Sequence, residues 1–189
     1  MRLLNPKSTK AVFLDRDGVI IKTKIKNGRP YAINSILEIE LIDGVIDGLK
    51  LLKSFGFLLF IITNQPDVGF GTQTKESVES IHRWLMDKLP LDEIAVCYSR
   101  SEEDGESRYK PSPNMLNELA HKFNIDLSQS FLIGDRWRDI GAGENAGCKT
   151  IFIDYSYEEP NPFTPTWTVP SFVKAIEIIE AEVKEIGGL

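Results

Sequence analysis

Five short segments of the sequence are apolar throughout apart from Thr150, and this feature limits the possible folds more than any other. They span residues 11–14, 57–62, 94–98, 131–133 and 150–153, and they are rich in β-branched and aromatic residues. A strand with one wet face alternates apolar and polar residues, whereas a strand covered on both faces is apolar throughout. The segments therefore predict strands of a parallel sheet that is buried on both faces.

Helical patterns lie between these segments. Apolar residues recur at helical spacing in residues 45–55, 75–89, 113–123, 137–146 and 170–186. Strands that alternate with helices form right-handed crossovers, which place helices on both faces of the sheet. We therefore expect an α/β fold, a Rossmann-like three-layer α/β/α sandwich with a central parallel sheet. A length of 189 residues suffices for one such core, so residues 1–189 are expected to form a single domain.

Residues 20–33 interrupt the alternation of strands and helices. Their hydrophobic and basic residues alternate around Asn27-Gly28, a dipeptide typical of tight hairpin turns. We expect a β-hairpin flap that lies over the strand ends. Its basic side chains are expected to form a solvated face, from which one could reach an anionic substrate. These residues are Lys22, Lys24, Lys26 and Arg29.

The charge pattern and the cysteine content argue against several classes of protein. The net charge is −6 and no basic stripe is present, which disfavours nucleic acid as a partner. The longest apolar run, residues 57–62, is too short to span a bilayer, and residues 1–10 lack the apolar core of a signal peptide. Only Cys97 and Cys148 occur, far apart, so no disulfide framework is expected. These features predict a cytoplasmic monomer without a membrane partner.

Asp15 and Asp17 directly follow the first apolar segment, at the point where a buried strand would end in a loop. In an extended chain, residues two positions apart point the same way, so both carboxylates could share one pocket. Two like charges at this spacing repel each other unless a cation or a proton lies between them. Gly18 would then let the chain turn away. An isolated D-x-D-G is more often an ordinary turn, so its meaning depends on the rest of the chain.

Further polar groups occur at the ends of other predicted strands. Residues 63–65 (TNQ) follow the second apolar segment, and Asp135 follows the fourth, with Asp139 four residues later. Lys110 precedes the helix predicted near residue 113. Each group alone could be a turn, a helix cap or a solvated lysine. Because the carboxyl ends of parallel strands share one edge of a sheet, together they indicate a single site.

These residues resemble the haloacid dehalogenase superfamily of aspartate-nucleophile phosphatases. Its four motifs occur in order as DRDG (15–18), TNQ (63–65), KP (110–111) and GDRWRD (134–139). Stretches such as FLDRDGVI, TNQPDVGFGTQT and GDRWRDIGAGENAGC are similar to the histidinol-phosphate and heptose-bisphosphate phosphatases of that superfamily. The resemblance covers essentially the whole chain and implies a small capless hydrolase, with access to its site controlled by loops and the flap.

The resemblance implies a role for each polar group. Asp15 would attack phosphorus and form an aspartyl-phosphate, which divides one difficult substitution into two easier ones. Asp17 would protonate the leaving alkoxide and then activate the hydrolytic water. Thr63 and Lys110 would hold the transferring phosphoryl group and offset its charge in the transition state.

The resemblance also implies a bound Mg²⁺. Its ligands would be the Asp15 carboxylate, the Asp17 main-chain carbonyl, Asp135 and water, a set of hard oxygen ligands that suits magnesium better than zinc. Asp139 is expected to steady this shell or Lys110 rather than to bind the ion directly. Related phosphatases usually carry a zinc site, C-x-H followed by C-x-C, before the KP motif. Only Cys97 of that set is retained, so we expect no zinc.

The residue before the motif lysine also departs from the pattern of the resembling phosphatases. They usually have an arginine there, whereas this sequence has Tyr109, which cannot bind a second phosphate through a bidentate fork. Arg108 and Arg136 are candidates to contact the substrate in its place. The residues expected to bind substrate are Thr63, Asn64, Gln65, Arg108, Tyr109, Lys110 and Arg136.

Other conspicuous residues are interpreted as structural. His82 lies in a helical pattern far in sequence from the carboxylates, where a solvated or internally bonded histidine is the usual case. Trp137 is typical of helix packing, although it stands beside the predicted metal motif. Trp167 is expected to fix the proline-rich connection 160–170 to the body of the domain.

The sequence thus predicts a Mg²⁺-dependent phosphomonoester hydrolase for a small phosphorylated sugar. Hydrolysis of D-glycero-D-manno-heptose 1,7-bisphosphate at its 7-phosphate is the leading hypothesis, and histidinol-phosphate phosphatase activity, which needs the same core motifs, is second. A nucleic-acid 3′-phosphatase would also use these motifs, but the acidic charge balance argues against it. A noncatalytic binding protein of the same fold would need neither the nucleophile Asp15 nor the acid Asp17.

Overall fold

Six parallel strands form the central sheet, in the order β5-β4-β1-β6-β7-β8. The structure is a computed structural model, and it describes residues 9–26, 29–101, 108–159 and 162–187. The parallel sheet predicted from the apolar segments is confirmed. Its strands are β1 (Ala11–Leu14), β4 (Leu58–Asn64), β5 (Glu93–Cys97), β6 (Phe131–Gly134), β7 (Lys149–Ile153) and β8 (Trp167–Val169).

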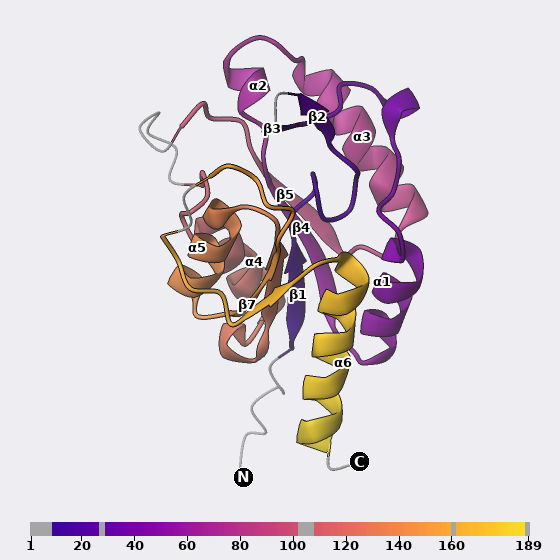
Figure 1. Cartoon of the computed structure of the whole chain (residues 1–189), viewed down its shortest axis with the longest axis vertical. Coiled ribbons are helices and arrows are strands. Elements are labelled where there is room, and N and C mark those ends of the chain that lie inside the picture. Colours follow the sequence, from indigo (N-terminus) through magenta and orange to yellow (C-terminus); the bar gives the residue numbers. More distant parts are fainter. Residues whose placement is uncertain (1–8, 27–28, 102–107, 160–161, 188–189) are drawn as a thin grey trace.

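Helices cover both faces of the sheet, as Figure 1 shows. The helices on one face are α1 (Val45–Ser54), α3 (Lys75–Lys88) and α6 (Phe172–Gly187), and those on the other are α4 (Asn114–Phe123) and α5 (Trp137–Ala146). Successive residues of β1 enter different cores: Val12 and Leu14 pack with residues of α1 and α6, whereas Ala11 and Phe13 pack with residues of α4. Both faces of β1 are therefore dry, which explains its uninterrupted apolar sequence.

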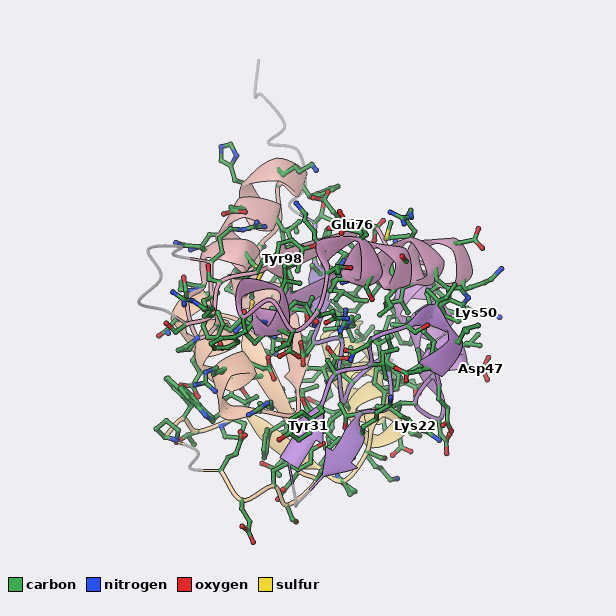
Figure 2. The ribbon with its side chains drawn as sticks, turned by 90° about the horizontal axis from the view of Figure 1, so that it is seen from above. Lys22, Tyr31, Asp47, Lys50, Glu76 and Tyr98 are labelled. Carbon is green, nitrogen blue, oxygen red and sulfur yellow. The ribbon has the colours of Figure 1, made fainter. Side chains whose placement is uncertain are left out.

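The segment between β1 and α1 crosses the carboxyl ends of the strands. It contains an antiparallel hairpin of β2 (Lys24–Lys26) and β3 (Arg29–Tyr31), followed by a short 3-10 helix, η1 (Ile36–Glu38), that contacts α3. The predicted flap is confirmed, although the turn at 27–28 lies outside the described residues. Figure 2 looks down on this edge of the molecule and labels Tyr31 of the hairpin.

The lysines of the flap pair with carboxylates at the surface. Lys22 Nζ lies 2.5 Å from Glu40, and Lys24 pairs with Glu38. Both lysine side chains are more than 40% exposed, with 44% for Lys22 and 45% for Lys24. For these two residues, the prediction of a solvated face is confirmed.

One strand was not predicted. The segment 160–170 was expected to be a connection, but residues 167–169 form β8, which pairs with β7 through Trp167 and Ile151. The strand has three residues and contains the exposed Thr168, so it gives no continuous apolar signal. Three other short elements also lack a signal, namely η1, α2 (Pro66–Gly69) and η3 (Leu127–Gln129). Within the described ranges, no helix has the length and apolarity needed to cross a membrane.

Candidate active site

The carboxyl ends of β1 and β4 open into a cavity of about 230 Å³, which the hairpin and the start of α5 also border. Most residues of the predicted site line it together. These are Asp15, Asp17, Thr63, Asn64, Gln65, Tyr109, Lys110, Arg136 and Asp139. The parallel sheet thus brings four separate sequence motifs to one place, as expected from the rule that strand ends share an edge.

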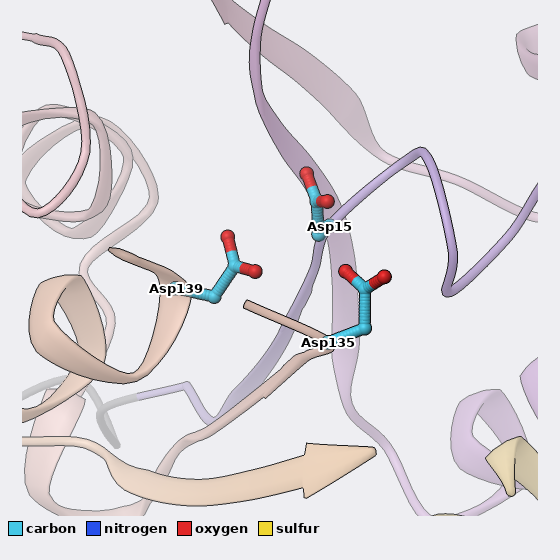
Figure 3. A group of neighbouring side chains, drawn as sticks. All are labelled: Asp15, Asp135 and Asp139. Carbon is cyan, nitrogen blue, oxygen red and sulfur yellow. The ribbon is translucent and has the colours of Figure 1, made fainter. Parts of the chain in front are cut away.

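The ammonium group of Lys110 is the centre of the charge network in this cavity. Its Nζ donates to Asp15 Oδ1 at 2.8 Å, to Asp139 Oδ1 at 2.5 Å and to the Ile62 carbonyl oxygen at 2.9 Å. Lys110 is only 3% exposed, so these bonds satisfy a cation that has been removed from water. Figure 3 shows the carboxylates of Asp15, Asp135 and Asp139 converging.

Burial and charge act together on these groups. Burial alone would lower the pKa of Lys110, but the carboxylates of Asp139 and Asp15 outweigh burial and raise that pKa. Burial raises the pKa of Asp15 to about 7, an effect that Lys110 opposes and that Asp139 and Asp17 reinforce. Lys110 therefore keeps its proton at neutral pH, whereas its charge does not outweigh the effect of burial on Asp15, whose pKa stays raised.

Asp135 and Asp139 differ in how their oxygens are used. Asp139 accepts hydrogen bonds at both oxygens, from Lys110 and from the main-chain N–H of Arg136 at 3.0 Å. Both oxygens of Asp135 are buried and accept no well-aligned hydrogen bond from any described residue, although the Tyr157 hydroxyl lies near this carboxylate. Burial, together with the charges of Asp15 and Asp139, raises the pKa of Asp135 well above its usual value. Such a carboxylate needs either a proton or a cation.

A divalent cation fits the residues at this point. Asp15, Asp135 and Asp139 each place an oxygen within 4.8 Å of the others, close enough to share an ion. Asp139 already accepts a hydrogen bond from Lys110. The oxygens that remain available to an ion are therefore both oxygens of Asp135 and Oδ2 of Asp15. Hard carboxylate oxygens of this kind are the ligands that Mg²⁺ prefers.

Two glycines let these carboxylates approach the backbone. A Cβ atom at Gly18 would lie 2.0 Å from Asp135 Oδ2, and Gly18 has a φ of 93°, in the region that favours glycine. A Cβ atom at Gly134 would lie 2.1 Å from the Cβ of Asp139. No side chain fits at either position, so the packing of the acidic cluster requires both motif glycines.

The carboxylate of Asp17 is oriented by two donors that use the same oxygen. Gln65 Nε2 donates to Asp17 Oδ2 at 2.8 Å, and Arg16 Nε donates to it at 2.9 Å. Asp17 Oδ1 accepts no hydrogen bond from the described part of the chain. This free oxygen can carry a proton, as the acid–base role expected for Asp17 requires. Gln65 also donates to Thr63 Oγ1 at 2.9 Å, so the Thr63 hydroxyl hydrogen is free to point elsewhere.

His82, which was interpreted as structural, contacts Arg16 and so helps to position Asp17. The fully buried Arg16 places Nη1 3.2 Å from Nε2 of His82 on α3. A guanidinium only donates, so Nε2 must accept, and the ring proton sits on Nδ1, 4.0 Å from Glu79. Burial, with the charge of Arg16, lowers the pKa of His82 to about 3. Nothing in the spacing of residues 16 and 82 could have indicated this contact.

Asn64 holds the main chain of Lys110. Its side-chain oxygen accepts from the Lys110 N–H at 3.1 Å, and its Nδ2 donates to the Lys110 carbonyl oxygen at 3.3 Å. The peptide bond between Lys110 and Pro111 is cis. Asn64 therefore positions the lysine, while its predicted contact with substrate stays a prediction.

The arginines predicted to contact substrate pair with carboxylates. Arg108 Nε lies 3.2 Å from Glu118 of α4, and Arg108 is not among the described residues that line the cavity. Arg136 lines it, and its Nε donates to Glu159 at 3.1 Å. Their roles in binding stay predictions. A third arginine, Arg138, also lines the cavity and was not predicted from the sequence.

Comparison with known proteins places the chain in a family. Residues 108–175 match the family model of HAD-hydrolase-like proteins. A D-glycero-beta-D-manno-heptose-1,7-bisphosphate 7-phosphatase from Pasteurella multocida is 35% identical over 154 residues, which cover 76% of this chain and 80% of the relative. The enzyme of the same name from Escherichia coli is 34% identical over 158 residues, which cover 77% of this chain and 80% of the relative.

A solved structure shares the fold. The D,D-heptose 1,7-bisphosphate phosphatase from B. bronchiseptica, complexed with magnesium and phosphate, has a TM-score of 0.77 and 23% identity, and the match covers 92% of this chain and 99% of that one. The chain therefore belongs to the haloacid dehalogenase family and is a phosphatase. The resemblance seen in the four sequence motifs is confirmed.

Proposed function

We propose that the protein removes the 7-phosphate of D-glycero-D-manno-heptose 1,7-bisphosphate in a Mg²⁺-dependent reaction. Relatives that share 31% to 35% of their residues with this chain are named for this activity. The observation that carries the proposal is the buried contact of 2.8 Å between Asp15 Oδ1 and Lys110 Nζ, on the wall of a cavity that Asp17 also lines. A carboxylate nucleophile, a fixed cation and a second carboxylate with a free oxygen are the parts that this chemistry needs.

The reaction has two steps. In the first, the Asp15 carboxylate forms a bond to phosphorus while the ester bond breaks, and Asp17 Oδ1 gives its proton to the leaving alkoxide. In the second, Asp17 takes a proton from water as the water oxygen bonds to phosphorus and the bond to Asp15 breaks, which releases inorganic phosphate. Lys110 offsets the negative charge of the phosphoryl group in both steps, and the Thr63 hydroxyl donates to one of its oxygens.

Asp15, the Asp17 main-chain carbonyl and Asp135 would hold the magnesium ion, while Asp139 stays bonded to Lys110. Bound there, Mg²⁺ would offset charge on the carboxylates and on the phosphoryl oxygens. We propose no zinc site, because Cys97, the one retained ligand of the zinc pattern in resembling phosphatases, is buried in β5. The cytoplasmic location, the monomeric state, the single domain and the absence of nucleic-acid and membrane partners stay predictions.

Phosphate release from a panel of esters tests the proposal. The purified protein with Mg²⁺ is offered heptose 1,7-bisphosphate as both anomers, because relatives are named for the beta and for the alpha form. Histidinol phosphate and a 3′-phosphorylated oligonucleotide complete the panel. We expect kcat/KM for one heptose bisphosphate to exceed the values for the other two compounds about 100-fold or more. A higher value for histidinol phosphate would overturn the substrate, and no release from any ester would overturn the reaction.

A further inference from the structure

Three arginines lie in the two chain segments that border the cavity, and two of them are already paired. Arg108 lies 3.2 Å from Glu118, and Arg136 donates to Glu159 through Nε at 3.1 Å. The charge of each of these two guanidinium groups is therefore offset by a carboxylate of the protein itself. Neither arginine brings an unbalanced positive charge to a ligand in the cavity.

Arg138 differs from the other two. It lines the cavity, and no carboxylate of the described residues forms an ion pair with it. Its Nε is buried and has no hydrogen-bond partner within the described ranges, which is also true of Arg108 Nε, but Arg108 has the Glu118 carboxylate beside that nitrogen and Arg138 has none. Its position is instead defined by two aromatic rings, because its Cζ lies 4.3 Å from the ring centre of Trp137 and 5.9 Å from that of Tyr109.

We propose that Arg138 binds the second phosphate of the substrate, the one that is not cleaved. This inference rests on the proposed function, since it needs a substrate with two phosphates. Aromatic rings attract the flat face of a guanidinium, which leaves its N–H edges free. A guanidinium held in this way is preorganised for a bidentate contact with phosphate. The buried Nε would gain the hydrogen bond that it lacks in the free protein.

The chain links this contact to the reacting end of the cavity. Arg138 directly precedes Asp139, which binds Lys110, and Tyr109, whose ring lies near the guanidinium, directly precedes Lys110. Lys110, the cation for the reacting phosphate, and Arg138, the cation for the distal phosphate, therefore lie in two chain segments that contact each other. Their separation is fixed by the ion pair between Lys110 and Asp139, which allows recognition of two phosphates at a set distance.

The ratio of kcat/KM for heptose 1,7-bisphosphate to kcat/KM for heptose 7-phosphate tests this contact, because the second sugar lacks the distal phosphate. We expect Arg138→Ala to lower this ratio about 10- to 150-fold, the range for the loss of a charged hydrogen bond. The loss should be mainly in KM. Arg138→Lys, which keeps the charge but not the planar fork, should give an intermediate ratio.

Two matched variants serve as controls. Arg83→Ala removes the same charge from the exposed side of α3, and its ratio should equal that of the parent protein. Arg108→Ala removes the neighbouring paired cation. An unchanged ratio in Arg138→Ala with a native thermal melting curve, or a larger loss in Arg108→Ala, would overturn the inference while leaving the phosphatase activity established. A parent protein that hydrolyses neither sugar phosphate would overturn the proposed function and this inference with it.

Discussion

The floor and the rim of the cavity are built in opposite ways. The floor consists of four residues between 1% and 7% exposed. Asp15, Lys110 and Asp139 line the cavity, and Asp135 lies directly beside the carboxylates of Asp15 and Asp139. The rim consists of the two chain segments around the cavity that carry Arg108, Tyr109, Arg136 and Arg138, of which Arg108 does not itself line the cavity. Their side chains contact surface acids or aromatic rings. Charges on the floor are close together in a dry environment, so each depends strongly on its neighbours. Charges on the rim are better solvated and less interdependent.

This difference separates the residues of the floor, which carry out the reaction, from those of the rim, which determine the substrate. Strand ends and two close-packed glycines fix the floor, so its residues cannot move independently of the sheet. The rim comes from the loop before α4 and from the first turn of α5, where substitutions disturb little of the core. A family with this division can keep one reaction and change its substrate through the rim.

Asp15→Asn should give the largest effect of any floor variant. An amide cannot form the aspartyl-phosphate, so we expect kcat/KM to fall roughly 10⁴-fold or more. Phosphate release from heptose bisphosphate at saturating Mg²⁺ measures the loss. Arg108→Ala, a rim variant, should lose less than about tenfold. Similar losses in the two variants would contradict the separation between floor and rim.

Lys110→Met should have the largest effect on stability. It leaves the carboxylates of Asp15 and Asp139 buried without their cation, which costs about 3–5 kcal/mol of unfolding free energy. Lys122→Met is the matched control, because Lys122 pairs with Glu93 at 2.5 Å but its side chain is 60% exposed. That variant should lose less than about 1 kcal/mol. Urea unfolding at neutral pH measures the stability of both variants. Equal losses of unfolding free energy would show that burial does not strengthen the ion pairs of Lys110.

His82→Gln should change how stability depends on pH. In the folded protein His82 stays neutral, with its pKa lowered to about 3, whereas in the unfolded chain it takes up a proton near pH 6.5. The unfolded state then binds more protons below that pH, so His82 lowers stability by about 2 kcal/mol as the pH falls from 7 to 5. Glutamine can still accept from Arg16 and does not titrate.

The measurement for His82 is a difference between two proteins. Unfolding free energies of the parent and the variant are determined at pH 7 and pH 5, so that the titration of Glu79 and of the floor carboxylates is common to both. The parent should lose about 2 kcal/mol more than His82→Gln over this range. Equal pH dependence would mean that His82 is charged, or not buried against Arg16, in the native protein.

The floor could be predicted from the sequence because each of its residues follows a recognisable strand or stands in a motif at a helix start. The uninterrupted apolar segments define the strands, and a parallel sheet allows only one edge at which Asp15, Lys110 and Asp135 can meet. It was not predictable that the Asp135 oxygens lack hydrogen bonds, because this depends on which carboxylates pair with Lys110. The turn that places Asp139 beside Gly134 brings Asp139 within reach of Lys110.

The rim and the support below the floor could not be predicted in the same way. The contact between Arg16 and His82 joins the loop after β1 to α3, and no periodicity in the sequence indicates a contact between residues so far apart. The orientation of Arg138 depends on the rings of Tyr109, in the loop before α4, and Trp137, in the first turn of α5. β8 was missed because edge strands of three residues with a polar centre carry too few apolar residues for a pattern.

Magnesium binding should distinguish Asp135 from Asp139, and its effect on stability should be the smallest of the series. At ten times its Kd, Mg²⁺ should stabilise the parent protein by about 1.4 kcal/mol, seen as a rise in melting temperature that chelator reverses. Asp135→Asn should abolish this rise, because Asp135 supplies the open oxygens. Asp139→Asn should keep the rise while lowering the stability of the metal-free protein, since it weakens the bond to Lys110. If only Asp139→Asn lost the rise in melting temperature, the two roles would be reversed and Asp139, not Asp135, would hold the ion.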